Sequence, residues 1–114
     1  MMEQTSTNSP IDIKCLVGYF DNLVNQFFKI LPMRENGEDS VFIFMRSLQV
    51  ELIGYCNLVT SFKKNHYYLT LLSILEYLID TPDCAIEDVK REVFKAINIC
   101  KHISSDLSTD KLEG

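Results

Sequence analysis

The stretch from Asp39 to Lys64 constrains this chain most, because its apolar residues cover more of a helix than one buried side requires. At about 3.6 residues per turn, one broad apolar stripe faces a core. Its members are Val41, Met45, Leu48, Leu52, Tyr55, Cys56, Val59 and Phe62. The run Val41 to Phe44 alone also suits a strand. The helical spacing continues beyond it, so the sequence predicts a helix over residues 40–64.

A second group of apolar residues lies off that stripe: Phe42, Ile43, Val50 and Ile53. Small residues also recur every seven positions on one strip: Ser40, Ser47, Gly54 and Ser61. Such a repeat lets a neighbouring helix approach closely. The simpler interpretation is that the serines face water and Gly54 is tolerated, at about 1 kcal/mol relative to alanine. A helix that is apolar nearly all round is usually buried all round, in a bundle or at a subunit interface.

Three further helices are predicted, over residues 10–31, 66–80 and 82–105. The apolar stripe of the first is Ile13, Leu16, Phe20, Leu23, Phe27 and Ile30. Asn65 is expected to break or cap between residues 40–64 and 66–80, with one long kinked helix as the alternative. Pro10 opens the first at a position that favours proline, and Pro32 is expected to end it. The third has few polar positions, so it also looks buried on more than one side. Thr81-Pro82-Asp83 is a helix-start signal, with a capping threonine, a proline and then an acid.

The sequence therefore predicts an all-α fold: a single four-helix bundle-like domain over residues 10–105, monomeric or dimeric. Residues 1–9 are polar and are predicted to form a disordered tail, and residues 106–114 a frayed one.

Charge and targeting signals narrow the function classes. The net charge of −5 argues against a general nucleic-acid binder and against docking on an anionic membrane. No secretory signal and no bilayer-length apolar segment is visible, so we expect a cytoplasmic protein. The four cysteines form no C-x-x-C pair and are expected to be reduced thiols: Cys15, Cys56, Cys84 and Cys100.

The sequence offers little for chemistry. It has no nucleophile motif and no clustered glycines for a phosphate loop. The possible metal ligands have no recognised spacing, so no metal or other cofactor is predicted: His66, Cys84, Cys100 and His102. We therefore do not expect an enzyme.

The preferred function is a small acidic protein-binding module of the inhibitor, immunity, antitoxin, chaperone or regulator type. It would act through an apolar helix surface on another protein or on a second copy of itself. The predicted interface residues are Phe42, Ile43, Ser47, Val50, Ile53, Gly54, Tyr67 and Ile74. The alternative is a small-ligand sensor, whose core pocket would be lined by Phe27, Phe28, Phe44, Phe62, Tyr55 and Tyr68.

Overall fold

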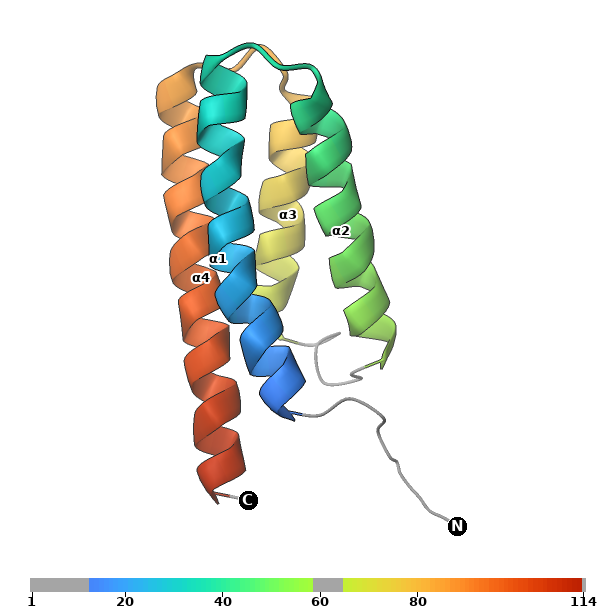
Figure 1. Cartoon of the computed structure of the whole chain (residues 1–114), viewed down its shortest axis with the longest axis vertical. Coiled ribbons are helices and arrows are strands. Elements are labelled where there is room, and N and C mark those ends of the chain that lie inside the picture. Colours follow the sequence, from blue (N-terminus) through green and yellow to red (C-terminus); the bar gives the residue numbers. More distant parts are fainter. Residues whose placement is uncertain (1–12, 59–64, 114) are drawn as a thin grey trace.

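The computed structural model describes residues 13–58 and 65–113, with side chains described over 13–55 and 65–107. The chain runs up and down through four helices (Figure 1). Their bounds are α1 (Ile13–Glu35), α2 (Ser40–Leu58), α3 (His66–Asp80) and α4 (Ile86–Glu113). No strand occurs in the described ranges. The predicted all-α, four-helix bundle-like domain is confirmed.

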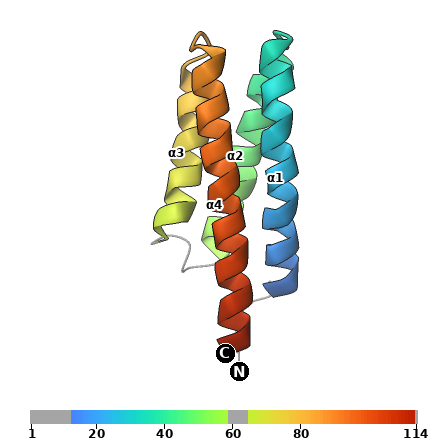
Figure 2. The ribbon, with the colours of Figure 1, turned by 90° about the vertical axis from the view of Figure 1, so that its left-hand side faces the viewer.

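The helices do not pack equally. The contact between α1 and α4 is the most extensive, α3 packs against both α4 and α2, and α1 touches α2 least. Two views at right angles place α2 and α4 at opposite corners of the bundle (Figures 1 and 2). One side of α2 therefore points away from all three other helices.

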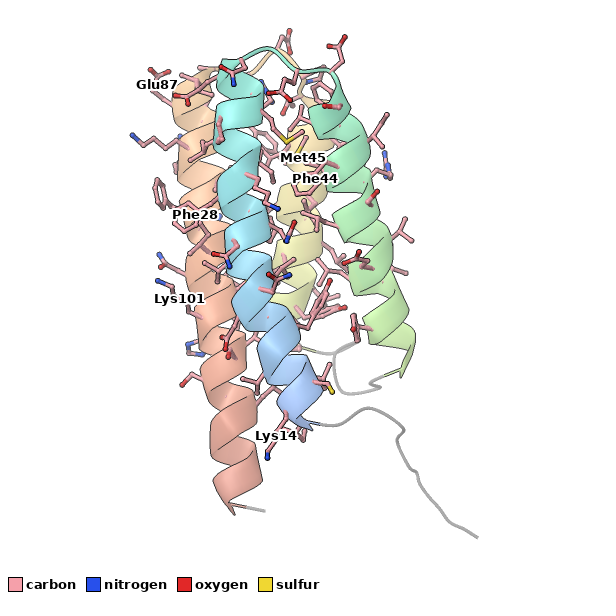
Figure 3. The ribbon with its side chains drawn as sticks, viewed as in Figure 1. Lys14, Phe28, Phe44, Met45, Glu87 and Lys101 are labelled. Atoms are coloured by element: carbon pink, nitrogen blue, oxygen red, sulfur yellow. The ribbon has the colours of Figure 1, made fainter. Side chains whose placement is uncertain are left out.

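The core is built from the apolar stripes that the sequence predicts. From α1 it takes Leu16, Phe20, Leu23, Phe27 and Ile30, and from α2 Val41, Met45, Leu48 and Leu52. Phe44 and Met45 lie on the side of α2 that faces its neighbours (Figure 3). Full burial of each large apolar side chain contributes about 1.5–3 kcal/mol, so this interior is the main source of stability.

Tyr68 ties α3 to α2 at the centre of the bundle. Its side chain is fully buried, its ring meets Phe20 edge-on, and its hydroxyl donates a hydrogen bond to the carbonyl of Leu52. A buried hydroxyl needs such a partner, because an unpaired one loses its hydration without compensation. The start of α3 was also predicted correctly, since the Asn65 side chain accepts from the Tyr68 amide at 2.9 Å.

The predicted end of the first helix at Pro32 is wrong, because α1 continues through the proline to Glu35. Hydrogen bonds to the segment between α3 and α4 stabilise the last turn of α1. Arg34 Nη2 donates to the carbonyls of Pro82 at 3.0 Å and Cys84 at 3.2 Å. After Glu35 the chain turns at Gly37, whose φ of 67° is left-handed, and the Glu38 amide donates back to the Met33 carbonyl at 2.9 Å.

The predicted start of the fourth helix at Thr81-Pro82 is also wrong. Thr81 instead ends α3, because its amide and its hydroxyl both donate to the Tyr77 carbonyl, at 3.0 and 2.6 Å. The helix α4 begins at Ile86, with Glu87 and Asp88 in its first turn. It runs to Glu113, past the end near residue 105 that the sequence predicted. Among the described residues, no helix combines the length and the apolarity that crossing a bilayer requires.

Candidate functional site: the outer face of α2

The side of α2 that points away from the bundle carries apolar residues in the open. Ile43 is 73% exposed, Val50 61% and Ile53 46%. Ser47 lies between Ile43 and Val50 along the helix, Gly54 directly follows Ile53, and both are exposed too. These five residues are called the outer face of α2 below. Residues at positions 43, 47, 50 and 54 share one side because they are three or four positions apart.

A groove runs beside this face, between α2 and α3. It encloses about 550 Å³ and is lined by Phe42, Ile43, Arg46, Ser47, Val50 and Ile79. Phe42 is half-buried and reaches from the groove to the core. Sequence analysis missed Arg46 and Ile79 as lining residues. Arg46 was detectable in principle, because it lies between Ile43 and Val50 on the helix surface.

Arg46 is held in place by a polar network across α2 and α3. Its guanidinium donates to the Gln49 side chain and lies 3.8 Å from the Glu76 carboxylate, to which Gln49 also donates at 2.8 Å. Hydrogen bonds from Gln49 and then Asp80 lower the pKa of Glu76, while the bond to Glu76 raises the pKa of Asp80. This edge of the face therefore carries a hydrogen-bonded network of one guanidinium, one amide and two carboxyl groups.

The opposite edge of the face, toward α1, is acidic. Tyr19 of α1 donates to the Glu51 carboxylate at 3.1 Å and packs on the Tyr55 ring, with centroids 4.5 Å apart. Burial, and then the charge of Glu51, raise the pKa of Tyr19 well above its usual value, so the hydroxyl keeps its proton. A hollow of about 190 Å³ between α1 and α2 includes Tyr19, Phe44 and Glu51 in its walls.

Two predicted interface residues lie elsewhere. Ile74 is only 3% exposed and belongs to the core, so its assignment to an exposed surface is wrong. The reason is that α3 packs against both α2 and α4, which widens its buried side. Tyr67 is 39% exposed, but its ring packs on His102 of α4 at 4.2 Å between centroids, away from the outer face of α2.

The aromatic residues proposed for a sensor pocket are dispersed. Phe27 and Tyr68 are fully buried within the packed core, whereas Phe28 is 43% exposed and meets Phe94 of α4 edge-on at 5.9 Å. Figure 3 shows Phe28 and Phe44 on different sides of the bundle. Phe62 lies outside the described residues. The walls of the two hollows described above include Phe44 and none of the other described members of this set.

In the described part of the chain, no three His, Cys, Asp or Glu side chains are close enough to hold a metal ion. The described cysteines, Cys15, Cys84 and Cys100, are free thiols. The side chain of Cys56 lies outside the described set. Comparison of the chain with protein-family models, with curated proteins and with solved structures gave no match.

Proposed function

We propose that this protein is a binding module that takes an apolar helix of another polypeptide chain against the outer face of α2. One observation carries the proposal: Ile43, Val50 and Ile53 share one side of one helix and are 73%, 61% and 46% exposed. Soluble proteins rarely leave neighbouring large apolar side chains open unless something covers them. The adjoining groove of about 550 Å³ supplies a concave wall for an incoming side chain.

The free energy available sets the kind of complex to expect. Full burial of a valine or isoleucine contributes about 1.5–3 kcal/mol, so covering these three partly exposed side chains contributes roughly 3–5 kcal/mol. Association itself costs about 4–15 kcal/mol. Contacts in the groove, with Phe42 and Ile79, must therefore add to the affinity. We expect a reversible complex rather than a permanent one.

The class of protein follows from what the face contains. Its residues are apolar or small, and the charged groups at its edges already have contacts: Arg46 with the Glu76 carboxylate, and Glu51 with the Tyr19 hydroxyl. Such a surface favours recognition of a protein by an inhibitor, chaperone or regulator over catalysis, by analogy at the level of fold and surface. The free thiols suit a reducing compartment, so we place this activity in the cytoplasm.

An affinity-capture experiment with matched variants tests the proposal. Tagged wild-type protein, Val50→Asp and Leu69→Asp are used as baits in an extract of the native host, and each captured protein is then purified and titrated by calorimetry. Leu69 of α3 is a suitable control because it is an exposed apolar residue, at 44%, outside the outer face of α2.

We expect Val50→Asp to weaken binding at least about tenfold, since a charge would be buried against an apolar partner. Leu69→Asp should bind like the wild type, and circular dichroism should show both variants folded. The proposal fails if folded Val50→Asp and Ile43→Asp bind every purified partner as tightly as the wild type does.

A further inference from the structure

Large and small side chains alternate along the outer face of α2, at spacings that are the same when counted from either end. Ile43 is large, Ser47 small, Val50 large and Gly54 has no side chain, at spacings of four, three and four positions. Reversing the helix keeps these spacings and exchanges large for small. A second α2 laid antiparallel therefore presents a small residue opposite each large one.

We infer that the partner covering this face is a second copy of the same chain, with the two α2 helices antiparallel. The inference rests on the proposed function, because it uses the same face. A twofold axis between positions 48 and 49 places Ile43 against the partner's Gly54 and Val50 against the partner's Ser47. Both contacts then occur twice, as in the isologous interfaces of most dimers.

The free space around Gly54 supports a close approach. A Cβ built at Gly54 meets no described atom within 4 Å, so nothing in the described subunit requires glycine there. Glycine destabilises a helix interior relative to alanine. The missing side chain would let a second helix come close to this part of α2. A parallel pair would instead set Ile43 against the partner's Ile43 and glycine against glycine, which leaves voids between the large contacts.

The charges at the two edges tolerate this arrangement. The twofold axis brings Arg46 and the partner's Arg46 to one edge, where each already has a Glu76 at 3.8 Å. That edge therefore holds two cations beside the Glu76 and Asp80 carboxyl groups of both copies. At the other edge, Glu51 and the partner's Glu51 are five residues apart along the axis, or about 7.5 Å. This is close to the Debye length of about 8 Å at physiological salt, so salt weakens their repulsion without abolishing it, which keeps the dimer weak.

The size of the contact sets the strength of the dimer. The strip from Ile43 to Gly54 is about 17 Å long, and one helix pair of this length covers less than the roughly 800 Å² per partner of a standard interface. The dimer is therefore weak and reversible.

Sedimentation equilibrium of the full chain tests the dimer directly. The wild-type mass should rise from 13.2 kDa toward twice that value as the concentration goes from about 1 μM to about 1 mM. Val50→Asp should stay monomeric over this range, and Leu69→Asp should dimerise like the wild type. A wild type that is monomeric throughout, or folded Val50→Asp that dimerises normally, overturns the inference.

Two further variants test the antiparallel order. Gly54→Leu places its Cβ in open space within the described subunit and replaces a poor helix former, so it should raise the melting temperature. It should nevertheless weaken dimerisation at least about tenfold by occupying the space of the partner's Ile43. Gly18→Leu is the matched control, because Gly18 of α1 is equally unobstructed and lies outside the face. Tighter dimerisation by Gly54→Leu would overturn the close antiparallel contact.

Glu51→Gln is the second variant that tests whether the two helices are antiparallel. In the antiparallel dimer it removes a like-charge contact, so affinity should stay the same or rise. In a parallel pair, Glu51 would face the partner's Arg46 and the same change would weaken dimerisation, which would overturn the antiparallel assignment.

The proposed binding function and the inferred dimer can also fail separately. A monomeric wild type that loses a purified partner protein upon Val50→Asp keeps the proposed function and assigns the face to that protein.

Discussion

At the scale of single residues, the thiol of Cys100 reports how thoroughly the bundle excludes water. Cys100 of α4 is fully buried among apolar side chains. Burial raises the pKa of this thiol from its ordinary value of 9.0 to about 12, because the thiolate would lose its hydration inside the protein. In the unfolded chain the thiol regains its ordinary value, so the two states hold different numbers of protons at alkaline pH.

This difference predicts an alkaline loss of stability. Below pH 9 both states are protonated and the contribution of Cys100 is fully present. Between about pH 9 and 12 the unfolded chain releases the proton first, so the free energy of unfolding falls as pH rises. Urea unfolding from pH 8 to 11 should show a steeper fall for the wild type than for Cys100→Ala. Tyr19 acts in the same direction in both proteins and cancels in the comparison. Parallel curves would contradict the prediction.

At the scale of elements, α1 carries an exposed proline within its last turn. Pro32 has no amide to donate to the carbonyl of Phe28, and its ring crowds that carbonyl. The turn nevertheless forms because Arg34 and Gly37 fix the segment that follows it. The helix therefore contains a local conflict between sequence preference and tertiary contacts.

Pro32→Ala should relieve this conflict. A proline in a helix interior costs about 3 kcal/mol relative to alanine, and loss of its restraint on the unfolded chain returns up to about 1 kcal/mol. We expect a net gain of about 2 kcal/mol in the free energy of unfolding, measured by urea denaturation. Pro82→Ala is the control, because Pro82 lies in the turn before α4 and not in a helix. An unchanged or lower stability for Pro32→Ala would show that α1 depends on the proline.

The helices and their ends show which parts of the fold were predictable from the sequence. Apolar spacing is a property of each helix alone, so it predicted all four helices and the buried stripe of α1. Asn65 marked the start of α3 because its cap is a local hydrogen bond. Pro32 and Thr81 misled the prediction because their outcome depends on distant partners: Arg34 spans 48 positions to Pro82. Local preference is overridden where such contacts exist.

The candidate site was predictable in part for the same reason. Ile43 and Val50 stood out because they lie off the core stripe of a single helix, and both are exposed. Ile74 was misplaced because its burial depends on how α3 sits between two neighbours. Ile79 reaches the groove only because α3 packs beside α2. When the burial of a residue, or its place in a groove, depends on a neighbouring helix, the apolar pattern of its own helix does not predict it.

At the scale of the whole molecule, the four helices are held unequally. The pair α1 and α4 shares the most extensive contact, whereas the contacts of α2 with α3 and with α1 are the two least extensive in the bundle. An element with less extensive packing opens locally at a lower free energy.

Hydrogen–deuterium exchange should therefore rank the helices. At protein concentrations low enough to favour the monomer, we expect amides of α2 to exchange faster than those in the central turns of α1 and α4. Protection of α2 should increase when its outer face is covered, while α1 and α4 change little. Equal protection of α2 and α4 in the monomer would contradict this ranking.

The contacts of Arg34 have a mechanical consequence for the helix that carries the site. Arg34 joins the end of α1 to the turn that precedes α4, and its guanidinium lies 5.8 Å from the ring centre of Phe42, in the first turn of α2. One end of the bundle is therefore clamped, with Gly37 as the natural pivot beside the clamp. Any swing of α2 away from α1 must open at the opposite end, past Tyr19 and Glu51. The 3.1 Å hydrogen bond between Tyr19 and Glu51 lies toward that end, so we expect it to break before the contacts of Arg34 whenever α2 moves away from α1.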